Sequence, residues 1–75
     1  MRSDAEVSVL RAVGLAVRTR RVAAELSQED LAHATGLHRT YVGSVERGER
    51  NVSILNLYKL AVTLQCPAQE LLPDR

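Results

Sequence analysis

Aromatic residues are nearly absent from this 75-residue chain, which has no tryptophan, no phenylalanine and only two tyrosines. Its core must therefore consist of leucine, valine, isoleucine and alanine, a composition that suits packed helices. Proline and glycine are also scarce, with two and four residues, so few positions interrupt a helix. Hydrophobic residues make up 45% of the chain, which indicates a globular protein. The length allows one domain, of marginal stability as a monomer.

Several functional classes are excluded by what else is missing. The single cysteine, Cys66, cannot form an internal disulfide, and no apolar run approaches the roughly 20 residues of a membrane span. Asp4 and Glu6 interrupt the pattern of a secretory signal. His33, His38 and Cys66 lack the spacing of zinc ligands, and there is no glycine-rich phosphate-binding loop. We therefore expect a cytoplasmic protein with no membrane association, metal, cofactor, small-molecule substrate or catalytic residue.

The chain also lacks a large surplus of charge of either sign. Ten basic residues face nine acidic ones, giving a net charge of +1, whereas nucleic-acid-binding domains commonly carry a pronounced basic surplus. The distribution is nevertheless uneven. Arginines gather at two places, namely Arg18, Arg20 and Arg21, then Arg39, Arg47 and Arg50. The total charge therefore decides little, and the positions of the arginines matter more.

The first expected helix begins at Ser3 or Asp4, because Ser3 and Glu6 have the spacing of a capping box, and it runs to about Ala24. Gly14 lies inside it and weakens it by about 1 kcal/mol relative to alanine. Its missing side chain would allow another helix to approach closely. The apolar residues recur at every fourth position: Val9, Val13 and Val17.

Two short helices joined by a tight turn are predicted within about residues 27–48. Ser27 and Asp30 form a second capping box, and Gly36 ends that helix in a left-handed conformation. The next helix begins after Leu37 and ends at Gly48. The expected inward residues are Leu31, Ala32, Val42 and Val45. The few residues between the helices fit a helix-turn-helix.

Two further helices are predicted in about residues 53–72. Ser53 caps the fourth, which reaches Gln65, and Pro67 suits the first turn of a short fifth helix that reaches Leu71 or Leu72. The expected core stripe of the fourth helix is Ile54, Leu57, Ala61 and Leu64. The predicted fold is thus an all-α, five-helix bundle in one domain, residues 1–75.

The fourth helix carries a second apolar face. Leu55 and Val62 are seven residues apart and fall on this face, with Tyr58 between it and the core stripe. Two apolar faces on one helix of a small domain need two partners. Either the fifth helix folds over the second face, or the face forms a dimer interface that also includes Leu72.

The helix-turn-helix sequence resembles the phage-repressor-like (Cro/repressor-type, Xre) regulators, and the fold implied is the lambda-repressor-like DNA-binding domain. The matching residues are LSQEDLA at 26–32, Gly36, and VERG at 45–48. The runs RTYV at 39–42 and ERGERN at 46–51 are similar to the controller proteins of restriction-modification systems. The resemblance covers about residues 13–72. It implies a cytoplasmic homodimer that binds double-stranded DNA at a pseudo-palindromic operator and regulates its own gene and the nuclease gene.

The resemblance also implies which residues touch DNA. It places the third helix in the major groove, where arginine can pair bidentately with guanine and discriminate by about 1–3 kcal/mol. The implied base contacts are Arg39, Thr40 and Ser44. Other residues would bind phosphates, which position a protein without reading sequence: Gln28, His38, Tyr41, Arg47, Arg50 and Asn51. Solvent exposure alone for Arg39, capping for Gln28 and screening of the helix end for Arg47 remain the plain alternatives.

The resemblance also implies one ion pair, and the sequence departs from the family pattern at two positions. Arg21 and Glu46 match a pair that joins the first and third helices in this family, which implies a structural role. Glu25 replaces the usual glycine, so the turn after the first helix is expected to be strained or differently shaped. His38 stands where a better cap is usual, and histidine is a weak cap.

An alternative function is an antitoxin-type protein-interaction module. Such a protein would use the second face of the fourth helix to bind a toxin, and it would retain the DNA-binding motif. The two functions can overlap in one chain.

Overall fold

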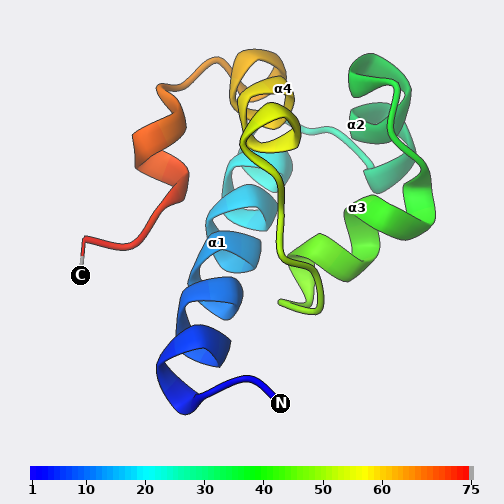
Figure 1. The fold of residues 1–75 in the computed structure, drawn as a ribbon. Helices are drawn as coiled ribbons and strands as arrows, with labels where there is room; N and C mark the ends of the chain where they lie inside the picture. The colour runs from blue at the N-terminus through cyan, green and yellow to red at the C-terminus, as the bar shows by residue number, and fades with distance from the viewer. Residues whose placement is uncertain (75) are drawn as a thin grey trace.

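The computed structural model describes residues 1–74 and contains four α-helices followed by one 3-10 turn (Figure 1). Its helices are α1 (Asp4–Ala23), α2 (Gln28–Thr35), α3 (Arg39–Glu46) and α4 (Ile54–Leu64), and the turn is η1 (Ala68–Leu71). Over these 74 residues the chain forms no strand. The all-helical prediction is confirmed, but the predicted fifth α-helix is wrong.

Two prolines explain why η1 is a 3-10 turn. Pro67 precedes it and Pro73 follows shortly after, so the segment is too short for a stable α-helix. A residue before proline avoids the helical region, and Leu72 is accordingly extended, with φ −98° and ψ 147°. Short 3-10 segments are common as such connectors. Leu71 is fully buried and anchors the turn to the core.

The helix starts follow the predicted capping residues. The Ser3 and Ser27 hydroxyls each accept a hydrogen bond from the third helical residue, and Glu6 and Asp30 return the bond to the cap backbone. Ser53 accepts a bond from the amide of the third residue of α4. Because these signals depend only on neighbouring residues, they can be read directly from the sequence.

Left-handed residues end the helices. Gly36 has φ 75° as predicted, and Glu25, where the resembling family has glycine, also has a positive φ of 59°. Gln65 takes the same conformation after α4, again with φ 59°, a feature that sequence reasoning missed. Left-handed backbone costs a residue with a side chain roughly 1–2 kcal/mol. The strain expected in the turn after α1 is therefore present at Glu25.

One hydrophobic core joins all five elements. The predicted inward residues of α1 to α3 are buried, with the exception of Val9. In α4 three of the four predicted core residues, Leu57, Ala61 and Leu64, belong to the core. The prediction is wrong at Ile54, which is 85% exposed, and it missed Leu60, which is fully buried. Ile54 is the first residue of α4, and helical side chains lean toward the N-terminal end, so it projects past the helix. Val9 is 40% exposed and lies in the first half of α1.

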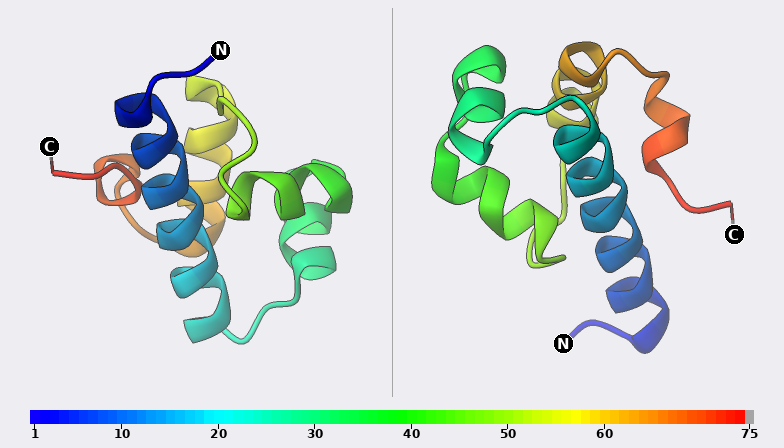
Figure 2. Two further views of the ribbon diagram at one scale, coloured as in Figure 1. Left: turned by 90° about the horizontal axis from the view of Figure 1, so that it is seen from below. Right: turned by 180° about the vertical axis from the view of Figure 1, so that it is seen from behind.

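Helix α1 lies in the middle of the molecule. Figure 2 shows α2 and α3 on one side of it and η1 on the other, in both views. Within the 74 residues described, no helix is long and apolar enough to cross a membrane. The arrangement leaves the outer surfaces of α3 and α4 uncovered by other elements (Figure 1).

Candidate nucleic-acid interface

Helix α3 is held against α1 by a close approach of backbone to backbone. A Cβ atom on Gly14 would lie 2.4 Å from the carbonyl oxygen of Val45 and 2.6 Å from that of Glu46. Only glycine allows this separation, as predicted from its position in α1. The contact fixes the C-terminal end of α3 and leaves its opposite face open.

The same end is held by a largely buried ion pair. Arg21 Nε donates to Glu46 Oε2 at 2.6 Å and Nη2 donates to Oε1 at 3.0 Å, while Nη1 donates to the Leu26 carbonyl. The side chains are 12% and 3% exposed. The hydrogen bond to Glu46 raises the pKa of Arg21 above its usual value despite burial. The predicted structural pair is thus present, and it orients α3 relative to α1.

Gln28 joins this network from the start of α2. Its Nε2 donates to Glu46 Oε1 at 3.1 Å, and the side chain is half-buried. The amide group is therefore positioned between α2 and α3. The hydrogen bond to Glu46 is a contact beyond helix capping, because it joins α2 to α3. The phosphate contact of Gln28 remains a prediction.

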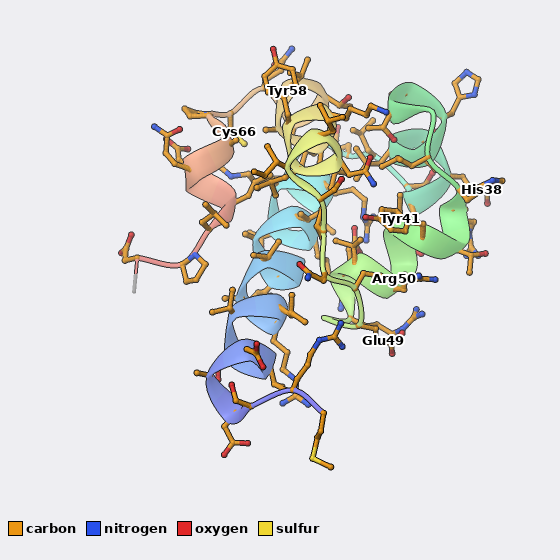
Figure 3. The ribbon with its side chains drawn as sticks, in the orientation of Figure 1. His38, Tyr41, Glu49, Arg50, Tyr58 and Cys66 are labelled. Atoms are coloured by element: carbon orange, nitrogen blue, oxygen red, sulfur yellow. The ribbon has the colours of Figure 1, made fainter. Side chains whose placement is uncertain are left out.

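The N-terminal end of α3 is the most exposed part of the motif. Arg39 and Thr40 are exposed, and Arg39 makes only a long ion pair of 3.8 Å with the exposed Glu29. Exposed pairs of this kind contribute little, so the guanidinium is available to a ligand. His38 projects from the outer edge (Figure 3) and makes no cap hydrogen bond through its side chain, which confirms that it is a weak cap.

Ser44 does not fit its predicted base contact. It is 5% exposed, its Oγ donates to the Tyr41 carbonyl at 2.8 Å, and the same oxygen accepts from Arg50 Nε at 3.1 Å. The segment after α3 folds back and covers it, which spacing within the helix does not reveal. We therefore correct this assignment: Ser44 positions Arg50 and does not face a base.

Arg50, in the segment after α3, is held against two residues of α3. Its guanidinium lies 5.7 Å from the centroid of the Tyr41 ring, a favourable cation–π arrangement, in addition to the bond with Ser44. Figure 3 shows Tyr41, Arg50 and Glu49 gathered along α3 and the segment that follows it. Two predicted phosphate-binding residues, Tyr41 and Arg50, thus form one pre-arranged unit.

Two other predicted phosphate-binding residues lie at the far end of α3. Arg47 forms an exposed ion pair with Glu49, with Nε and Oε2 3.1 Å apart. Asn51 is exposed. A phosphate that approaches Arg47 would compete with a weak, solvent-screened pair, so this arginine can exchange partners.

Tyr41 also connects α3 to α4. Asn56 Nδ2 donates to the Tyr41 hydroxyl at 3.1 Å. Sequence reasoning missed Asn56, because no local pattern pairs residues 15 positions apart. The hydrogen bond ties the exposed helix of the motif to the helix that carries the second apolar face.

That second face of α4 is uncovered. Leu55, Tyr58 and Val62 are exposed, as is Leu72, so η1 does not fold over them. Tyr58 points away from the body of the molecule in Figure 3. Of the two alternatives drawn from the sequence, burial by the last segment is therefore wrong. An apolar stripe of this kind commonly marks an interaction surface.

Among residues 1–74, no group of three or more histidine, cysteine or acidic side chains could hold a metal ion. What the site offers is an exposed helix end with an arginine and a threonine, flanked by arginines and held rigidly by buried contacts. Such a helix can enter the major groove of DNA, and the flanking groups can bind phosphates.

Known proteins share this fold and much of this sequence. The helix-turn-helix family model matches residues 17–71. Control protein C.SmaI from Serratia marcescens is 54% identical over 56 residues, which are 75% of this chain and 67% of that protein. Control protein C.MunI from Mycoplasma sp is 42% identical over 57 residues, 76% of this chain and 77% of that protein. The crystal structure of the restriction-modification controller protein C.AhdI from Aeromonas hydrophila is similar with a TM-score of 0.80 and 52% identity, over 83% of this chain and 94% of that one.

Proposed function

This chain belongs to the helix-turn-helix family, and we propose that it is a sequence-specific DNA-binding regulator of transcription, a controller protein of a restriction-modification system. It binds a pseudo-palindromic operator as a homodimer in the cytoplasm. Residues 27–48 read the DNA and about residues 53–72 form the dimer. The observation that carries the proposal is the exposed N-terminal end of α3, with Arg39 and Thr40 free of strong partners.

Helix α3, the recognition helix of this proposal, is pre-organised for this function. The Arg21–Glu46 pair and the contact at Gly14 hold α3 against α1, so little conformational freedom remains to be lost on binding. Arg39 supplies a bidentate donor for guanine, and Thr40 supplies a hydroxyl and a methyl group. The candidate phosphate contacts lie along α2, α3 and the segment after α3: Gln28, His38, Tyr41, Arg47, Arg50 and Asn51. The similarity to two named control proteins supports the assignment to this kind of regulator.

A binding-site selection on randomised duplexes tests the reading role. The wild-type chain should enrich a two-fold symmetric site with half-sites about 34 Å apart. Arg39→Ala should relax the preference at one position of each half-site, at a cost of about 1–3 kcal/mol. Arg47→Ala serves as the control, because loss of a phosphate contact weakens binding to all sequences alike. An Arg39→Ala profile identical to that of the wild type would refute the assignment.

The exposed stripe of α4 supports the homodimer. Sedimentation can test it with two matched valines: Val62 on α4 is 57% exposed and Val22 on α1 is 56% exposed. Val62→Glu should shift the protein to monomer, whereas Val22→Glu should leave the dimer intact. Equal behaviour of the two variants would contradict a dimer formed through α4.

The stripe also favours a second candidate function, an antitoxin-type module whose α4 binds a different protein. In that case the purified chain remains monomeric with and without its own upstream DNA. Copurification in fixed proportion with a small protein that Val62→Glu fails to retain would favour this candidate over the homodimer.

A further inference from the structure

The first half of α1 lies against the segment that follows the recognition helix. A Cβ atom on Gly48 would lie 2.8 Å from Arg11 Cγ and 3.0 Å from Arg11 Cα. Gly48 has a φ of 77° and follows α3 closely. Arg11 therefore begins beside the C-terminal end of the recognition helix, and its long, exposed side chain starts from there.

The segment before α1 approaches the same place. Arg2 and Asn51 line one hollow of about 300 Å³, together with Glu6 and apolar residues of α1. Figures 1 and 2 agree that the N-terminal segment lies near the connection between α3 and α4. Arg2 is thus placed next to the candidate phosphate contact Asn51, and Arg11 is placed against Gly48, three residues before Asn51.

Neither Arg2 nor Arg11 forms an ion pair with another residue in 1–74. The ion pairs within residues 1–74 involve other arginines, at positions 20, 21, 39 and 47. Of the nearby carboxylates, Glu49 pairs with Arg47 and Glu6 accepts a hydrogen bond from the Ser3 backbone amide, while Asp4 forms no ion pair with either arginine. The family model begins at residue 17, so both positions precede the shared motif.

We propose that Arg2 and Arg11 bind phosphates of the DNA backbone and extend the interface beyond the helix-turn-helix. The proposal rests on the proposed function. A guanidinium donates paired hydrogen bonds to phosphate, and such contacts add affinity without reading sequence. Each of the two contacts releases counterions, so the dependence of binding on salt becomes steeper.

The test measures DNA affinity of the full chain across a salt series, by fluorescence anisotropy with a short mixed-sequence duplex. Arg2→Gln and Arg11→Gln remove the charge and keep the aliphatic stem. Each should reduce the slope of log K against log salt by about 0.9, and the double variant by about twice that. Arg11→Lys keeps the charge and should keep the slope.

Arg18→Gln is the matched control. Arg18 is also exposed and is two turns further along α1, so the variant removes the same charge at a different place. Unchanged slopes in Arg2→Gln and Arg11→Gln would overturn the proposal. Equal decreases in all three variants would also overturn it, because net charge would then explain the result. Failure of the wild type to bind any duplex would instead reject the proposed function itself.

Discussion

Two glycines inside helices give a matched test of how α3 is held in place. Gly14 and Gly43 both lie within α-helices, so replacing either with alanine improves helix propensity by about 1 kcal/mol. The new methyl groups meet different neighbours. The methyl group at position 14 would lie 2.4 Å from a backbone oxygen of α3. The methyl group at position 43 would lie 3.2 Å from its nearest neighbour, the flexible end of the Arg47 side chain.

The magnitudes follow from these contacts. Relief of the contact in Gly14→Ala requires the end of α3 to shift by about 1 Å, although Val45 is 1% exposed and Glu46 is bound to Arg21. Overpacking costs about 1–3 kcal/mol, and a clash with backbone belongs at the upper end. After the gain in propensity, we expect Gly14→Ala to lose about 2 kcal/mol. Gly43→Ala should gain roughly 0.5–1 kcal/mol, because the Arg47 side chain can move aside.

Urea unfolding followed by circular dichroism measures both free energies of unfolding. All variants are compared at one protein concentration, because a dimer is stabilised by mass action. A loss of 2 kcal/mol lowers the melting temperature of a domain this size by about 8–16 °C. If Gly14→Ala is as stable as Gly43→Ala, the close approach of α1 and α3 does not exist in solution and the reasoning fails.

Three further changes test the other contacts. Glu46→Ala leaves Arg21 buried and unpaired and should lower the free energy of unfolding by about 3–5 kcal/mol. An effect below 1 kcal/mol, the size typical of an exposed pair, would contradict the burial. Glu25→Gly should stabilise the protein by about 1 kcal/mol because it removes left-handed strain, and a lower melting temperature would argue against that backbone conformation. Hydrogen bonds from the backbone and side chain of Ser27 lower the pKa of Asp30. The ionised Asp30 carboxylate therefore stabilises the folded chain at neutral pH, and this stabilisation is lost as the pH falls below about 4. Acid unfolding of the wild type should be steeper than that of Asp30→Asn, and identical pH profiles would speak against the cap.

The sequence allowed the local structure to be predicted more reliably than the distant contacts. Ser27 and Gly36 identify the start and end of α2 because caps depend on adjacent residues. The extra helix was predicted because Pro67 suits a helix start, although Pro73 ends the segment before an α-helix can form. The face of α4 was misjudged at Ile54, whose exposure depends on its position at the end of the packed helix.

The site shows the same division. The exposure of Arg39 follows from its position at the start of a recognisable motif, and its contact with DNA remains a prediction. Ser44 was assigned to the DNA surface because one helical turn separates it from Thr40. Ser44 is buried, however, and it accepts a hydrogen bond from Arg50, which returns from the next segment. Asn56 had no local signal, since only the fold brings it to Tyr41.

The bond between Tyr41 and Asn56 has a consequence for the length of DNA that the protein recognises. Leu55, on the exposed face of α4, is the immediate neighbour of Asn56, so the surface proposed for dimer formation begins one residue from the bond to α3. In a symmetric dimer paired through α4, the distance between the two copies of α3 is then fixed by the tilt of one short helix. Such a dimer would bind only half-sites at a defined separation. Asn56→Ala would loosen the attachment of α3 to α4 and leave the DNA-contacting surface of each α3 unchanged.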